Sequence, residues 1–129
     1  MGARSEALAK QFEASVQEAV AVLEKLSDAD WKKVTEAEQW TVGVTAHHLA
    51  SALEPVAGIV STIVSGQSRG NFTRAMLDEM NARHAQEHPN CTKAETIALL
   101  KRGAAAAAAV VRGLTDDQLA QSGTVLMDA

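Results

Sequence analysis

Apolar residues recur at helical spacing along much of this chain, and this periodicity limits the fold more than any other feature. Between residues 5 and 26 the steps from one apolar residue to the next are four, four, three, four and three. Such steps place these side chains on one face of an α-helix, with Lys, Gln and Glu on the other. The apolar positions are Leu8, Phe12, Val16, Ala19, Leu23 and Leu26. A second stripe over residues 97–114 follows Thr92 and Glu95, whose spacing is that of a capping box at a helix start.

Two further helices are predicted between these stretches. Residues 41–65 begin at Thr41, which can cap the first turn, and they contain Pro55, which should bend the helix. Residues 71–88 form the next helix, which must end before Pro89. Short capped turns are expected after the first and last long helices, at residues 27–31 and 115–119, and we expect Trp31 to cover one end of the bundle.

The composition agrees with packed helices. Hydrophobic residues make up 47% of the 129 residues but aromatic residues only 3%, so the core must be built from Leu, Val, Ile, Ala and Met. The Ala run at 104–109 has no large side chain, which lets a neighbouring helix approach closely. A chain of this length can bury one core. We therefore predict an all-α fold with a single domain over residues 1–129.

Several functional classes are disfavoured. The net charge of −4, with both signs interspersed, predicts no nucleic-acid partner, because such surfaces show a basic face. No apolar run is long enough for a membrane span, and the first residues lack the apolar region of a signal peptide. The single Cys91 cannot form an intramolecular disulfide and suits a reducing compartment. We expect a cytoplasmic protein.

His47 and His48 are the first candidate functional residues. Adjacent residues on a helix point about 100° apart, so only one of the two can face a core squarely. His48 shares a row with Val44, and His47 shares one with the more polar Ser51 and Glu54. We therefore expect His48 to point inward and His47 to lie near the edge. A buried imidazole needs a partner, which could be a backbone carbonyl or a metal ion.

His84 and His88 are the second candidates. They lie four residues apart and hence on one helix face, which is a spacing used by metal ligands. The alternative is that His88 serves the dipole at the helix end. Cys91 follows three residues later, as a further ligand or an incidental loop cysteine. On the same helix, Asn81 is expected to be solvated or to line a cleft, and Met76 and Met80 to fill the core.

The stretch Trp40-Thr41 followed by His48-Leu49-Ala50 resembles the W-[ST]…H-[LI] signature of the DinB/YfiT-like superfamily. That group includes the N-terminal domain of mycothiol-dependent maleylpyruvate isomerase. The resemblance extends over most of the chain and includes the helix start at Thr92 and the turn at residues 114–119. It implies a DinB-like four-helix bundle that often holds a divalent metal ion, such as Zn or Ni, on three side chains. The first family ligand maps onto His48.

The sequence departs from the family pattern near its end. The resemblance places the second and third ligands on a final helix, as His or Glu followed four residues later by His. Only residues 120–129 follow Leu119, and they contain no His. We therefore expect the final helix to be missing, the metal site to be incomplete and metal binding to be weak or absent. His84 and His88 are not the family pair and stand as a separate hypothesis.

Two functions remain open. The resemblance implies a metal-dependent enzyme, a thiol-linked transferase, isomerase or hydrolase acting on small molecules, with His48 as ligand and His84 and Asn81 lining the cleft. The incomplete ligand set predicts that the 129-residue chain is inactive and favours the alternative, a non-catalytic helical module for binding or oligomerisation. Apolar stripes left without cover predict a homodimer, because exposed apolar patches usually mark interfaces. In that dimer, Val125, Leu126 and Met127 would insert into the partner.

Overall fold

The computed structural model describes residues 2–36, 39–66 and 73–121. Regular structure in these residues is helical, with one isolated antiparallel bridge between Val34 and Thr41. The all-α prediction is therefore confirmed. The helices are α1 (Ala3–Lys25), α2 (Asp28–Trp31), α3 (Val42–Val64), α4 (Arg74–Glu87), α5 (Lys93–Arg112) and α6 (Asp116–Leu119).

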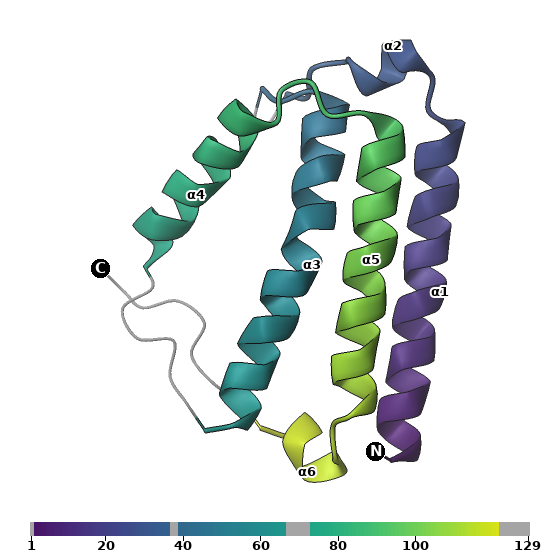
Figure 1. Ribbon diagram of the computed structural model, residues 1–129, viewed down its shortest axis with the longest axis vertical. Coiled ribbons are helices and arrows are strands. Elements are labelled where there is room, and N and C mark those ends of the chain that lie inside the picture. The colour runs from purple at the N-terminus through teal and green to yellow at the C-terminus, as the bar shows by residue number, and fades with distance from the viewer. Residues whose placement is uncertain (1, 37–38, 67–72, 122–129) are drawn as a thin grey trace.

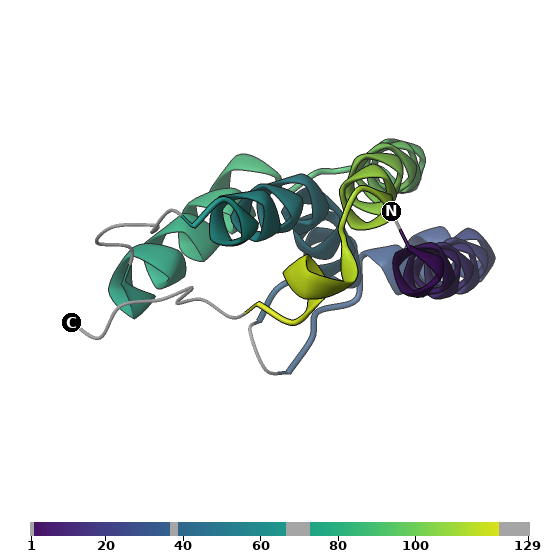
Figure 2. The same cartoon turned by 90° about the horizontal axis from the view of Figure 1, so that it is seen from below.

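Three long helices form the body of the bundle. Figure 1 shows α5 between α1 and α3, and the end-on view of Figure 2 shows the same order. The main packing contacts are accordingly those of α5 with α3 and with α1. Helix α4 lies on the outer side of α3, away from α1. Among the described residues, no helix is long and apolar enough to cross a membrane.

Side-chain caps start most of the helices, largely where the sequence predicts them. The Ser27 hydroxyl accepts from Asp30 N–H at α2, Thr41 from Val44 N–H at α3, and Thr92 from Glu95 N–H at α5. These oxygens satisfy amides that have no partner inside the helix. Equivalent caps at α4 and α6 are supplied by Thr73 and Thr115.

The core lies where α5 meets its two neighbours. It contains Val20 of α1, Ala50 of α3 and Leu100 of α5, with half-buried aliphatic residues packed around them. Ala104 and Ala108 are buried, so the Ala run of α5 does form a close helix interface as predicted. At the far end, Arg112 ties α5 to α1 through ion pairs with Glu6 (2.8 Å) and Glu13 (2.7 Å).

The prediction that Met76 and Met80 fill the core is wrong, because their exposed fractions are 46% and 52%. Helix α4 turns toward α3 with a row that includes Leu77, Asn81 and His84, all half-buried. Steps of four residues overshoot one helical turn by about 40° each, so a row counted back from His88 drifts off the contact face. Phe72, Val125, Leu126 and Met127 lie outside the described residues.

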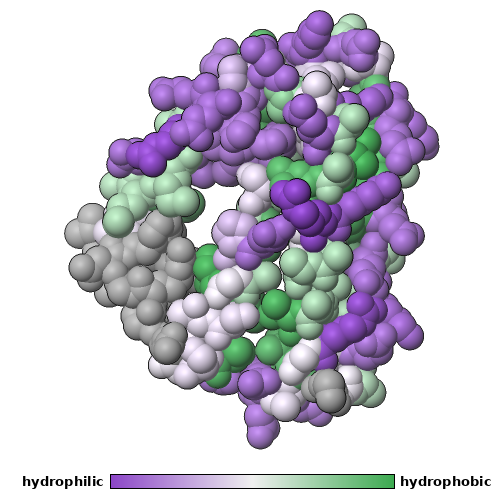
Figure 3. Space-filling model, in the orientation of Figure 1, coloured by the Kyte–Doolittle hydropathy of each residue, from purple (hydrophilic) through white to green (hydrophobic). Residues whose placement is uncertain are grey.

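Hydrophilic residues gather where α2 lies. In the view of Figure 3 they cover that end of the molecule, and apolar side chains show along the seams between the long helices. Trp31 of α2 is buried, with 9% of its surface exposed, and it covers this end of the bundle as predicted.

Candidate metal centre

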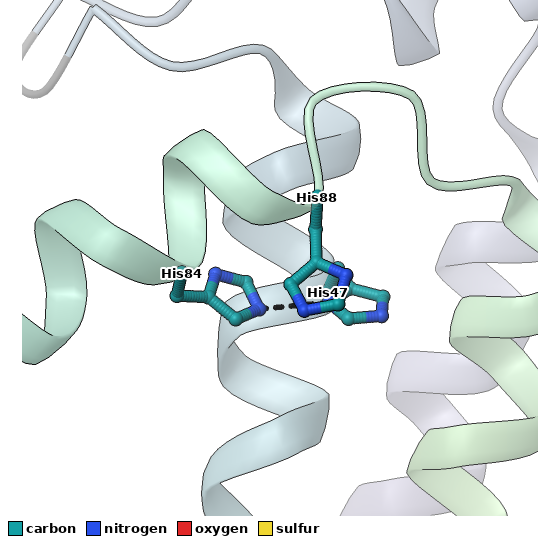
Figure 4. Close-up of side chains that lie close together, drawn as sticks. All are labelled: His47, His84 and His88. Carbon is teal, nitrogen blue, oxygen red and sulfur yellow. Dashed lines mark hydrogen bonds between the residues drawn. The ribbon is translucent and has the colours of Figure 1, made fainter.

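Two helices bring three histidines together near the end of the bundle that α2 covers. His47 lies in the second turn of α3, His84 in the last turn of α4, and His88 is the residue that ends α4. The backbone N–H of His88 still donates to the His84 carbonyl at 3.0 Å, so the two imidazoles stay one helical turn apart. Figure 4 shows the three rings converging from the two helices.

The geometry of this His cluster, formed by His47, His84 and His88, is compact. Nδ1 of His47 and Nε2 of His84 are 2.8 Å apart and share one hydrogen bond, so one ring donates and the other accepts. Ring centroids are 5.0 Å apart for His47–His84, 4.6 Å for His47–His88 and 4.8 Å for His84–His88. One ligand nitrogen from each ring lies within 4.8 Å of the other two.

These separations fit a metal ion. Bonds of about 2.0–2.1 Å in a tetrahedral zinc site put neighbouring donor nitrogens roughly 3.3 Å apart. The nitrogen–nitrogen distance between His47 and His84, 2.8 Å, and the outer limit of the ligand group, 4.8 Å, lie on either side of that value. Nε2 of His84 is the nitrogen that faces His47, and its Nδ1 is buried with no hydrogen-bond partner among the described residues.

Burial and neighbouring imidazoles favour the neutral form of His47 and His84. Burial, together with the three neighbouring histidines, lowers the pKa of His84 to about 4. Burial also lowers the pKa of His47, with a further contribution from His88. Neutral imidazole is the form that binds metal, so the lowered pKa values favour His47 and His84 as metal ligands at neutral pH.

The predicted orientation of the two adjacent histidines is reversed. His47 is buried, with 9% of its surface exposed, whereas His48 is only half-buried. The buried positions of α3 are Gly43, Val44, His47, Ala50 and Ala57, so the buried face runs through His47, and of the row that His48 shares with Val44 only Val44 is buried. Sequence reasoning therefore missed His47. Gly43, one turn before it in a helix otherwise rich in Val, Ala and Thr, is the signal that marks this face for close packing.

His48, predicted as the family ligand, lies beside the cluster. Its ring stands edge-on to Trp40 at 5.5 Å and to His84 at 5.0 Å between centroids. Its Nδ1 is buried and has no hydrogen-bond partner in the part of the chain that the structure describes. Among the described residues, the group of close ligand atoms contains His47 and not His48, so ligation by His48 stays a prediction.

Trp31 connects the two elements that carry the cluster. Its indole N–H donates to the Cys91 carbonyl at 2.9 Å, three residues after His88. Its ring also packs on Gly43, one turn before His47, so closely that a Cβ there would lie 2.8 Å from its Cδ1. Trp31 thus sets the spacing between α3 and the segment that follows α4. Cys91 contributes its carbonyl, while its half-buried thiol, whose pKa is raised by burial, lies outside the described ligand group.

A cavity of about 440 Å³ with a mixed polar and apolar lining lies between α3 and α4, on the side of the cluster where His48 stands. His48 and Asn81 both line it, so of the two alternatives for Asn81 the structure agrees with the cleft, whereas His84, expected to line the same cleft, is not among the described lining residues. The described lining residues are Trp40, Thr45, His48, Leu49, Asp78, Asn81 and Ala82.

Comparison with known proteins gives one match. Residues 12–129 match the family model described as the mycothiol maleylpyruvate isomerase N-terminal domain. No curated protein and no solved structure matches the chain significantly.

Proposed function

With that match over most of its length, the chain belongs to the mycothiol maleylpyruvate isomerase N-terminal domain family, a DinB-like group, and on this premise we propose that it is a metal-dependent enzyme. The metal would be a divalent ion, Zn or Ni, held by His47, His84 and His88. The substrate would be a small molecule, in a thiol-linked transfer, isomerisation or hydrolysis. The observation that carries the proposal is the close approach of three imidazoles, each of which places a ligand nitrogen within 4.8 Å of the other two.

The donor set determines the chemistry. Three protein ligands leave a divalent ion one open position, where the ion polarises a bound water or thiol and lowers its pKa. The protein supplies the arrangement around that position. Helix α3 fixes His47, the last turn and C-cap of α4 fix His84 and His88, and a cavity that could hold a small molecule lies beside them at His48.

This ligand set differs from the one that the family resemblance implies. There the second and third ligands come from a final helix, whereas here the pair spaced four residues apart lies on α4. The expectation of weak or absent metal binding depended on His48 acting without neighbours. Because His47, His84 and His88 form one group of close ligand atoms, we replace that expectation with stoichiometric binding.

Calorimetry with Zn²⁺ or Ni²⁺ tests the site, and the adjacent histidines provide a matched control. We expect one ion per chain for the wild type, loss of binding in His47→Ala and His84→Ala, and a smaller effect in His48→Ala. Helical circular dichroism checks that each variant is folded. Binding that survives His47→Ala but not His48→Ala would overturn the assignment, and no binding by the folded wild type would overturn the function.

Exposed apolar side chains favour a second role, a module that associates with a second copy of itself. Leu49 and Val56 of α3 are 65% and 51% exposed, and Met76 and Met80 of α4 are also largely exposed. Large apolar side chains in water on adjacent helices favour an interface. This role is compatible with the metal site, since the cluster uses other residues of the same helices.

A further inference from the structure

The cavity between α3 and α4 is lined by a carboxylate, Asp78, and an indole, Trp40, together with uncharged polar and apolar side chains. We propose that it binds small molecules that carry an ammonium group, with Asp78 as the counter-ion and Trp40 as the aromatic wall. The ammonium contact itself does not depend on the metal. Its use as a substrate subsite rests on the proposed function.

Charge is the first argument. Asp78 is the one formally charged side chain among the described lining residues, and none of them is Lys or Arg. Its carboxylate takes part in none of the ion pairs of the described residues, although Arg74 stands one turn before it on α4. A carboxylate without a cationic partner at the wall of a concave site attracts a cation and repels an anion.

Hydrogen-bonding capacity points the same way. The Thr45 hydroxyl donates to the Thr41 carbonyl at 3.0 Å, so it offers the cavity an acceptor. Asn81 adds an amide oxygen, and Asp78 adds two carboxylate oxygens. The wall is therefore rich in acceptors, and an ammonium group brings three donors to it.

The aromatic wall is held in place by the backbone. The Trp40 carbonyl accepts from Thr35 N–H at 2.6 Å, and the Lys33 carbonyl accepts from Val42 N–H at 2.8 Å, so the segment that carries Trp40 is tied down on both sides. Gln39, just before it, takes the left-handed conformation with φ of 59°. An indole that lines the same cavity as a carboxylate adds cation–π attraction for an ammonium group.

Position relates this subsite to the cluster. Asn81 and Asp78 precede His84 by three and six residues on α4, which is about 4.5 and 9 Å along the helix axis. A ligand lying along α4 would therefore place its ammonium end at Asp78 and its other end at the histidines. The substrate class that fits is a small amine whose reacting group lies about 9 Å from its nitrogen along the helix axis.

The test uses metal-free protein, so that it can fail separately from the metal proposal. The chain has two Trp residues, which give two indole N–H signals in a ¹H–¹⁵N spectrum, and loss of one in Trp40→Phe assigns them. The probes are benzylamine and benzoate, matched in size and opposite in charge. We expect benzylamine at millimolar concentration to shift the Trp40 signal and leave that of Trp31, and benzoate to shift neither.

Two neighbouring carboxylates supply the matched variants. Asp78→Asn should weaken benzylamine binding at least tenfold, whereas Glu79→Gln, which removes the partner of Arg83, should leave it unchanged. Equal responses to both probes, equal effects of both variants, or a Trp40 signal that does not respond would each overturn the proposal. If the ammonium contact holds in a protein that fails to bind Zn²⁺, the subsite stands and the metal function fails.

Discussion

Replacing Trp31 should weaken metal binding without unfolding the bundle. Trp31→Phe keeps an aromatic ring against Gly43 but removes the N–H that donates to Cys91. A carbonyl left without its partner in a partly buried position costs about 1–3 kcal/mol. The lost hydrogen bond holds the segment directly after His88. Without it, the His88 imidazole is no longer held in place against the His47 imidazole.

The expected loss of metal affinity can be estimated from other proteins in which a residue that orients a metal ligand is removed. Removing a group that orients a metal ligand typically costs about 10–100-fold in metal affinity. We expect Trp31→Phe to weaken metal binding about tenfold, because the aromatic ring still packs on Gly43. Gly43→Ala disturbs the same Trp31 contact from the α3 side, because the new Cβ would overlap the indole ring. Overpacking costs about 1–3 kcal/mol, partly offset by about 1 kcal/mol of helix propensity.

Zinc calorimetry and urea unfolding measure the two effects separately. The control is Thr115→Ala, which removes the cap of α6 at the other end of the bundle and should cost about 0.5–2 kcal/mol of stability. If Trp31→Phe and Thr115→Ala lose similar stability and both keep wild-type affinity, Trp31 is a core residue only and the reasoning fails.

Two further predictions concern pH and association. Because burial lowers the pKa of His84 to about 4, below about 6.5 in the unfolded chain, the unfolded state binds more protons between these values. The urea midpoint of the metal-free protein should stay constant above pH 6.5 and fall as the pH is lowered toward 4. In His84→Gln the midpoint should fall less steeply with pH, and equal pH slopes in the two proteins would contradict this. Light scattering at low micromolar concentration should give twice the chain mass of 13.6 kDa, and Leu49→Glu with Met80→Glu should shift it toward the monomer. A concentration-independent monomer for the wild type would exclude the homodimer.

The elements of the fold follow from local sequence chemistry. Thr41, Thr92 and Ser27 cap helices as their types and positions predict, because an N-cap depends on nearby backbone amides and not on the rest of the molecule. The Ala run of α5 likewise predicts a close contact, since small side chains permit it whichever helix approaches.

The site depends on information that is not local. The choice between His47 and His48 is a rotation of about 100° about the α3 axis, and contacts with Trp31 and α4 decide it. The face of α4 is decided in the same way, because the row of Met76 and Met80 rotates away from the turn that carries His84. The sequence predicts that His84 and His88 share one helix face, because they are four residues apart, but it does not predict that His47 joins them.

The position of α4 has a consequence for the rate at which a metal ion would leave. Among the described helices, α4 packs mainly on α3, and it lies apart from the core of Val20, Ala50 and Leu100. An element with few core contacts can open locally while the remainder stays folded. His84 lies in α4, His88 caps its end, and His47 lies in α3, so a bound ion would cross-link the two helices. Its dissociation would then follow the opening of α4, and its residence time would report the stability of that one helix.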